Sequence, residues 1–423
     1  MEEPYKLSAA QASRRIEAGD LTAERLAQSC VDRIAERERH IGAWAFLDRE
    51  QVLRQARVID RGPWRGGLHG IPVGIKDVID TAELPTEYNS PIYRGHRPKA
   101  DAACVALLKR AGAVILGKTV TTEFANIQAA HTRNPRNVVH TPGGSSSGSA
   151  AAVADDMTPI ALGTQTAGSV IRPAAYCGIY AIKPTFGSIN RTGVKPLADS
   201  LDTVGVFGRS PEDLGLALET LSAKKYLDLD VAAPRIGLCR TGRWLQADAE
   251  ARTNLEHAAQ RFERAGAIVK DFGLPGGADE LVDRHQHIMG FESARALAWE
   301  FDNFRPLLSS ALAERLEAGW QVPLAEYFAA RALTESCRLQ IASGFAEFDF
   351  LLTPSSAGEA PASIEKTGDS KFNRAWTALG FPCVNVPFGQ GNRGLPLGLQ
   401  LVGPHGTDMT LIAWAKWAAK ALQ

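Results

Sequence analysis

Residues 142–173 read PGGSSSGSAAAVADDMTPIALGTQTAGSVIRP and contain two segments rich in glycine and serine. In the first, Gly143 and Gly144 precede a group of serines, and in the second Gly168 directly precedes Ser169. Because glycine permits unusual φ values, such segments let backbone N–H groups converge on an anion or on a developing oxyanion. The apolar AAAVA between them favours a buried helix. The pattern indicates a functional site, although two solvent-exposed turns remain the simpler alternative.

The composition is that of a soluble globular protein. The chain has 423 residues, of which 45% are hydrophobic and 22% charged. Lysine plus arginine and aspartate plus glutamate both number 47, so the formal net charge is zero. This balance gives no electrostatic reason to expect a nucleic acid or an anionic membrane as a partner. No apolar run approaches the roughly 18 residues of a membrane span.

The N-terminal sequence and the cysteines favour a cytoplasmic location. MEEPYKLSAAQ carries two acids and no apolar core, which is unlike a signal peptide. The six cysteines lie far apart in the sequence and form no C-x-x-C pair. This distribution fits a protein whose cysteines stay reduced. His285 and His287 are two positions apart and cannot share one helix face, so we expect no helical metal site there. We expect no metal and no cofactor.

Helical and apolar segments alternate along the chain. Thr22 is placed to cap a helix reaching Arg39, and a second helix covers about 49–59. Residues 71–75 form a short apolar run typical of a buried strand. A helix opened by Asp101 and ended by Gly112 precedes the apolar strand AVIL. This alternation predicts an α/β fold with a largely parallel or mixed sheet.

The second half continues the pattern. Residues 163–169 are predicted as a loop, and the sequence beyond residue 173 as a strand and turn. An irregular, polar crossing is expected near 223–234. Further helices are predicted at 210–221, 248–265, 280–346 and 408–421, and strands at 234–240, 350–354, 383–389 and 396–403.

Two short motifs match patterns of other functions, a phosphate-binding loop and a nucleophile elbow. GAVILGKT at 112–119 matches the phosphate-binding pattern G-x-x-x-x-G-K-[ST], but its middle residues favour a strand rather than a phosphate-wrapping loop. GSSSG at 144–148 matches G-x-S-x-G, with Ser146 as nucleophile and His405 as a candidate base. The loop-like sequence before it disfavours a nucleophile elbow, which stays open as a minority alternative.

Lys76 is the candidate base if no histidine activates a serine. It follows the apolar run 71–75 and precedes Val78 and Ile79, so its side chain is expected to be buried. Burial lowers the pKa of a lysine by disfavouring the charged ammonium, and a neutral amine can accept a proton. A salt bridge to Asp77, Asp80 or another acid is an equally open alternative.

Three motifs together resemble the amidase signature family. They are GIPVGIKD, which contains Lys76, then PGGSSSGSAAAVA and GTQTAGSVIRPAAYCG. The similarity covers nearly the whole chain, including GKT at 117–119 and the segments DFLLTP and FPCVNVP. It implies a single large α/β domain over residues 1–423, with a central mixed β-sheet covered by helices on both faces. Residues 61–210 would carry the catalytic core.

The resemblance also implies a catalytic triad. Ser169 would be the nucleophile, Ser145 a bridging serine next to a cis peptide bond, and Lys76 the base. The family places the oxyanion under backbone N–H groups, which correspond here to Thr166, Ala167 and Gly168. Many members have glycine at position 167, and alanine would be strained there if the backbone required a positive φ.

Substrate and partner expectations rest on finer details. Gln165, the SVIRPAAYCG run and the short length resemble the malonamidase branch, in which Arg172 would hold a substrate carboxylate. Arg172 and Gln165 are therefore the predicted substrate-binding residues, with loop pinning as the alternative for Arg172. A small amide such as malonamate is the expected substrate, and a homodimer the expected assembly.

Other members of the family suggest other activities. Carboxylated ureides or aryl and indole acetamides are alternative substrates, for which Tyr88, Tyr93 and Trp299 could line an apolar pocket, although each is more typical of a core. The A-type component of an amidotransferase, which acts inside a larger complex, is a further alternative.

Overall fold

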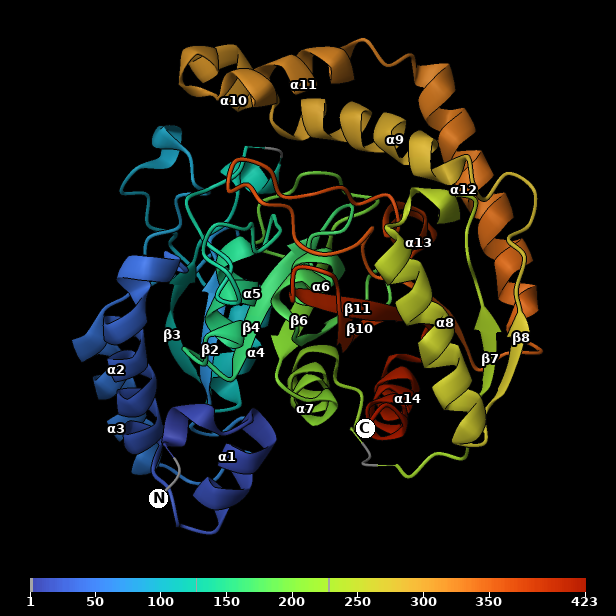
Figure 1. Ribbon diagram of the computed structural model, residues 1–423. Helices are drawn as coiled ribbons and strands as arrows, with labels where there is room; N and C mark the ends of the chain where they lie inside the picture. Colours follow the sequence, from blue (N-terminus) through green and yellow to red (C-terminus); the bar gives the residue numbers. More distant parts are fainter. Residues whose placement is uncertain (1–2, 127, 227–228) are drawn as a thin grey trace.

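A computed structural model describes residues 3–126, 128–226 and 229–423, and these form one α/β domain around a mixed sheet (Figure 1). The eleven strands in this part of the chain follow the order β1-β3-β2-β4-β6-β5-β10-β11-β9-β7-β8. The strands are β1 (Trp44–Phe46), β2 (Pro72–Lys76), β3 (Val114–Thr119), β4 (Ile160–Gln165), β5 (Tyr180–Lys183), β6 (Thr203–Gly208), β7 (Arg235–Leu238), β8 (Ile268–Asp271), β9 (Phe350–Pro354), β10 (Cys383–Gln390) and β11 (Pro396–Val402).

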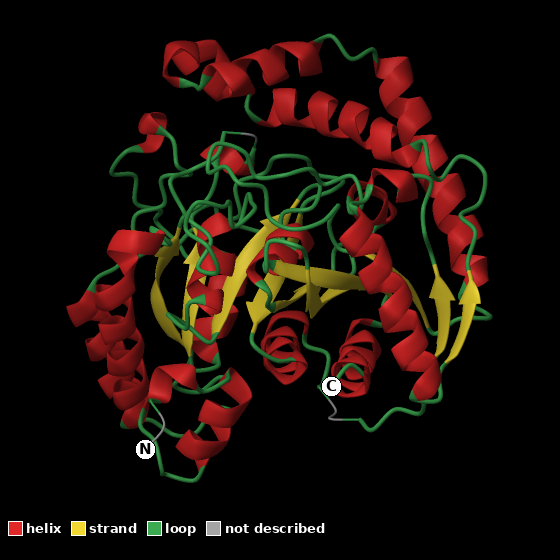
Figure 2. Cartoon of the chain, in the orientation of Figure 1, coloured by secondary structure: helices red, strands yellow, loops and turns green. Residues whose placement is uncertain are grey.

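Helices cover both faces of this sheet (Figure 2). Helices α7 and α14 pack together beneath the central strands, and the buried helices α5 and α6 pack above them. The helices are α1 (Ala9–Glu17), α2 (Ala23–Ile41), α3 (Arg49–Asp60), α4 (Ala103–Arg110), α5 (Ser147–Ala154), α6 (Ile171–Cys177), α7 (Pro211–Ser222), α8 (Ala249–Arg264), α9 (Leu281–Ala296), α10 (Ala298–Phe304), α11 (Ser310–Trp320), α12 (Leu324–Gly344), α13 (Arg374–Leu379) and α14 (Asp408–Ala421).

The predicted alternation of helices and strands is confirmed in most places. Thr22 caps α2 by accepting a hydrogen bond from the Arg25 N–H, and the predicted strand at 71–75 is β2. The predicted C-terminal pair is the antiparallel β10 and β11. Along α2, Leu26 and the apolar residues one turn apart are buried, because a 3.6-residue period puts them on one face.

The predicted strand AVIL is confirmed, because the phosphate-loop pattern at 112–119 is largely strand β3, whose residues are all buried, and forms no phosphate-wrapping loop. Two other local predictions were wrong. Gly163 belongs to β4, and the predicted second loop therefore begins only after Gln165. Residues 171–177 form α6, so in the segment after residue 173 a helix precedes the predicted strand. At Gly163, burial and pairing with strand β6 outweighed the local glycine signal.

The sheet brings distant residues to one edge. Strand β2 runs parallel to both β3 and β4, with Ile75 opposite Leu162. Parallel neighbours end at the same edge, so Lys76 at the end of β2 lies beside the loop that follows β4. Helix α5, in which every residue is buried, carries the first serine segment to the same place.

A helical cover lies over this edge. It comprises α9 to α12, residues 281–344, between β8 and β9 in the chain (Figure 1). Helix α13 follows β9 and packs against α9. These helices lie outside the predicted catalytic core of 61–210.

The predicted crossing at 223–234 is only partly described, because residues 227 and 228 lie outside the described residues. Among the helices that the structure describes, none is both long and apolar enough to cross a bilayer.

Candidate active site

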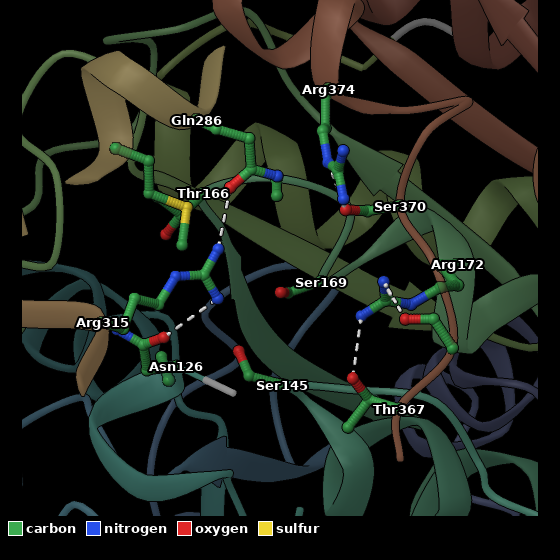
Figure 3. A pocket seen from close by; sticks show the side chains of 14 residues that line it. Asn126, Ser145, Thr166, Ser169, Arg172, Gln286, Arg315, Thr367, Ser370 and Arg374 are labelled. Atoms are coloured by element: carbon green, nitrogen blue, oxygen red, sulfur yellow. Dashed lines mark hydrogen bonds between the residues drawn. The ribbon is translucent and has the colours of Figure 1, made fainter. Parts of the chain in front are cut away.

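A pocket of about 180 Å³ lies beneath the helical cover (Figure 3). Ser145 and Ser169 both point into it, with Arg315 on one side and Arg172 on the other. It is lined by Ala125, Asn126, Ser145, Thr166, Ala167, Ser169, Arg172, Gln286, Met289, Arg315, Thr367, Gly368, Ser370 and Arg374. The structure thus brings together the two predicted catalytic serines, which are 24 residues apart in sequence.

Lys76 lies beneath Ser145, fully buried at the end of β2. Its Nζ is 2.7 Å from Ser145 Oγ and 2.8 Å from Thr164 Oγ1. The Thr164 carbonyl oxygen, at 3.5 Å, is a weaker third partner. The predicted contact between the buried lysine and the first serine segment is therefore present.

Burial lowers the pKa of Lys76 well below its ordinary value, and the nearby Asp202 carboxylate offsets only part of this effect. No carboxylate within the described residues forms an ion pair with Lys76. Asp77, one acid that sequence reasoning offered as a partner, instead pairs with Lys118 at 3.3 Å. An amine held among hydroxyl groups is suited to accept a proton.

Hydrogen bonds to the carbonyl groups of Gly144 and Ser145 hold the backbone at Ser145. The Gly144–Ser145 bond is cis, as the family resemblance led us to expect. The Ser145 carbonyl accepts a hydrogen bond from the Thr122 N–H, at 3.2 Å. The Gly144 carbonyl accepts one from the Arg172 guanidinium. These contacts fix the backbone that presents the Ser145 hydroxyl between Lys76 and the pocket.

Gln165 does not line the pocket. Its buried side chain binds the backbone that follows Ser169. Its Oε1 accepts hydrogen bonds from the N–H groups of Val170 and Ile171, at 2.8 and 3.0 Å. Its Nε2 donates to Thr377 Oγ1 at 2.9 Å. Because the side chain is fully buried and both its ends are occupied, the predicted substrate-binding role of Gln165 is wrong.

The predicted oxyanion loop, residues 166–168, lies between Gln165 and Ser169. Ala167 is not among the described residues with a positive φ, so alanine fits this backbone without the strain that the sequence left open. A Cβ added to Gly168 would lie 2.5 Å from Asn373 Oδ1, which explains the glycine. The N–H groups of Ala167 and Gly168 have no partner within the described part of the chain, so they are available to an oxyanion. The oxyanion role of the Thr166 N–H stays a prediction.

Arg172 reaches the pocket, but its guanidinium already binds the protein. It donates to the carbonyl oxygens of Gly144 and Gly368, and more weakly to Thr367 Oγ1 at 3.3 Å. These bonds match the loop-pinning alternative. Its Nε is buried without a partner within the described residues. The role of Arg172 as a substrate clamp stays a prediction.

Two further arginines line the pocket and were not identified from the sequence. Arg315 on α11 donates to Gln286 Oε1 at 2.8 Å and to Asn126 Oδ1 at 3.4 Å, both neutral groups. Arg374 on α13 pairs with Asp369 at 3.2 Å. Burial lowers the pKa of both guanidinium groups, and the Arg374 charge adds to the effect on Arg315. Nothing in their local sequence distinguishes them from ordinary helix-surface arginines.

The structure does not support the alternative nucleophile Ser146 with His405 as its base. Ser146 is fully buried, and its hydroxyl bonds to the Thr164 carbonyl instead of lining the pocket. His405 is exposed on a turn after β11. Neither residue is placed to form the catalytic pair of a nucleophile elbow. Within the described ranges, no cluster of three histidine, cysteine or acidic side chains is arranged to hold a metal ion.

Comparisons with known proteins agree with this geometry. A family profile described as Amidase matches residues 25–412. The A-type component of the glutamyl-tRNA(Gln) amidotransferase from Carboxydothermus hydrogenoformans is 32% identical, over 97% of this chain and 96% of that protein. A peptide amidase from Stenotrophomonas maltophilia is 30% identical, with a TM-score of 0.85 over 100% of this chain and 98% of the other. The crystal structure of an amidase gives a TM-score of 0.89 at 26% identity, over 99% of this chain and 100% of the other.

The fold and the buried Lys76–Ser145 pair beside Ser169 define an amide-hydrolysing class of enzyme. The chain belongs to the amidase signature family.

Proposed function

We propose that this amidase hydrolyses a small, carboxylate-bearing amide to the acid and ammonia through an acyl-enzyme on Ser169. The observation that carries the proposal is the joint placement of Lys76, Ser145 and Ser169 at a pocket whose lining has arginines and no acidic side chain. Malonamate is the simplest molecule of this kind.

The reaction begins with proton transfer along the three residues. Neutral Lys76 accepts the Ser145 hydroxyl proton while Ser145 accepts the proton of Ser169, whose Oγ attacks the amide carbonyl. The negative charge on the carbonyl oxygen is stabilised by the N–H groups of Ala167 and Gly168. The proton returns through Ser145 to the leaving nitrogen, the C–N bond breaks and ammonia departs. Water then attacks the acyl carbon by the same proton route and releases Ser169.

The pocket favours a negatively charged substrate. Its lining includes Arg172, Arg315 and Arg374 and no aspartate or glutamate. Arg315 makes no ion pair within the described residues, so its charge is not neutralised by a carboxylate. Asn126 turns its Oδ1 to Arg315, which has only donors, and its buried Nδ2 has no partner in the described ranges. A carboxylate, which only accepts hydrogen bonds, complements these donors.

The aromatic alternatives fit less well. A volume of about 180 Å³ is below the roughly 300 Å³ at which pockets for drug-sized ligands begin. Tyr88 and Tyr93 pack edge to face in a separate aromatic cluster, and Trp299 is 55% exposed. None of the three lines the pocket. We therefore favour a small acidic amide over aryl or indole acetamides, and over larger ureides.

A glutamine-hydrolysing component of an amidotransferase is the second candidate. The similarity to the A-type components of glutamyl-tRNA(Gln) amidotransferases extends over nearly the whole chain, which supports it. Glutamine, however, carries an α-ammonium group, and the pocket lining offers no carboxylate to receive it. This charge mismatch favours the acidic amide.

Ammonia release from malonamate, acetamide and glutamine, measured with the purified chain alone, tests both candidates. We expect the highest kcat/KM with malonamate, no ammonia with Ser169→Ala, and an acyl adduct on Ser169. Preference for glutamine, or activity that appears only after a partner protein is added, would favour the amidotransferase function. An adduct on Ser146 would overturn the assignment of the nucleophile.

Assembly and location stay predictions. A cytoplasmic homodimer is expected, and light scattering on the purified protein with fractionation of the source cells would check it.

A further inference from the structure

Two successive carbonyl groups of the oxyanion loop are held from outside the loop. The Thr166 carbonyl accepts a hydrogen bond from His285 Nε2 on α9, at 2.7 Å. The Ala167 carbonyl accepts one from Thr377 Oγ1 on α13, also at 2.7 Å. The two donors come from separate helices more than 110 residues further along the chain. The loop that precedes the nucleophile therefore depends on the elements that cover the pocket.

These bonds determine the direction of two N–H groups. In a planar trans peptide the carbonyl and the N–H point in opposite directions. When His285 fixes the Thr166 carbonyl, the Ala167 N–H must face the other way, and Thr377 has the same effect on the Gly168 N–H. Neither N–H group has a partner within the described residues. The two bonds thus point both groups away from the helices that hold the carbonyls.

His285 acts through the loop and has no contact with a substrate. It is fully buried and does not line the pocket. Because a carbonyl oxygen only accepts, Nε2 must carry the proton, and Nδ1 is buried without a partner in the described ranges. Burial lowers the pKa of His285 to about 3, and the positive charges of Arg374 and Arg315 act in the same direction. The imidazole therefore stays neutral at ordinary pH and keeps its single N–H for Thr166.

Thr377 belongs to a short chain of hydrogen bonds. Its hydroxyl accepts from Gln165 Nε2 at 2.9 Å, which leaves its own proton for the Ala167 carbonyl at 2.7 Å, with the Asn373 carbonyl at 3.1 Å as a further acceptor. Gln165 Oε1 in turn binds the N–H groups on the far side of Ser169. One buried network thus holds both sides of the nucleophile.

From this geometry we propose that His285 and Thr377 are positioning residues for the oxyanion-binding N–H groups of Ala167 and Gly168. The proposal rests on the proposed function, because it assigns a purpose to the loop beside Ser169. It makes α9 and α13 part of the catalytic apparatus, in addition to covering the pocket.

Matched pairs of variants separate positioning from simple packing. His285→Gln keeps a side-chain N–H donor, whereas His285→Leu removes it. Thr377→Ser keeps the hydroxyl, whereas Thr377→Val removes it at nearly the same volume. We expect kcat on malonamate to fall about 10- to 100-fold in the variants that lose the donor, with KM changed less than threefold. The donor-keeping variants should stay within about fivefold of the wild type.

Labelling of Ser169 by a small alkyl fluorophosphonate gives a readout that does not depend on the amide substrate. Its P=O oxygen needs the same N–H groups, so the labelling rate should fall in His285→Leu and Thr377→Val and recover in their partners. Equal rates within both pairs, at matched unfolding midpoints, would overturn the positioning role. Absence of labelling in the wild type would instead contradict the proposed function. If His285→Leu fails to fold, the Thr377 pair decides the question.

Discussion

Two buried lysines on neighbouring strands have opposite surroundings. Lys118 in β3 is fully buried with Asp77 at 3.3 Å and also donates to the Ile79 carbonyl. Lys76 at the end of β2 is equally buried but faces the hydroxyl groups of Ser145 and Thr164. A carboxylate stabilises an ammonium ion, whereas hydroxyl groups leave the cost of burying the charge largely uncompensated. The ion pair with Asp77 therefore distinguishes Lys118 from Lys76, whose proposed catalytic role needs a neutral amine.

Replacing Lys76 should have the largest effect on activity. Lys76→Met removes the base while filling a similar volume, so we expect kcat/KM for malonamate to fall at least about 10³-fold. Stability should be unchanged or higher, because an amine without an ion pair is removed from the interior. Ammonia release and denaturant unfolding measure the two effects. Loss of folding together with activity would contradict the distinction between the two lysines.

Replacing Lys118 should have the opposite effect. Lys118→Met leaves the Asp77 carboxylate buried without its cation, and we expect a loss of about 3 kcal/mol in the free energy of unfolding. Activity of the folded fraction should remain within about tenfold of the wild type. The double variant Lys118→Met/Asp77→Asn should recover part of the stability. A loss of activity as large as that of Lys76→Met, with stability unchanged, would break the comparison.

The pH profile tests the proposed role of Lys76. In the proposed mechanism the active form is the neutral amine, so kcat/KM should fall as the pH falls through the depressed pKa of Lys76, well below 10.5. The Asp202 carboxylate raises this pKa, and Asp202→Asn should therefore move the acid limb to lower pH. Activity that falls with rising pH over this range would be evidence against a neutral lysine base.

The smallest expected change concerns the hydroxyl that orients Lys76. Thr164→Val removes the partner at 2.8 Å and leaves Ser145 as the remaining hydroxyl partner of Nζ. A typical net hydrogen bond contributes about 1 kcal/mol, so kcat should fall roughly fivefold. Thr164→Ser keeps the hydroxyl and is the matched control. Equal kcat values for the two variants would show that Ser145 alone positions the amine.

The site shows where local sequence is informative. The glycine and serine segments around Ser145 and Ser169 carry their own signal, because an unusual backbone needs glycine. A lysine in an apolar strand indicates a buried amine, but Lys118 in β3 shows the same pattern, so only the family motif singles out Lys76. Arg315 and His285 lie on helices with ordinary patterns, and only packing against the loop after β4 makes them part of the site.

The sequence by itself determined the alternation of helices and strands, the family resemblance and the candidate triad, since these depend on local periodicity and on motifs that few structures can satisfy. Tertiary structure decided which lysine received the carboxylate, that Gln165 holds the loop instead of a substrate, and that the donors of Arg172 are largely engaged by backbone carbonyls. These contacts join residues that are far apart in the chain. They form only when the sheet edge and the helical cover pack together, so local sequence does not predict them.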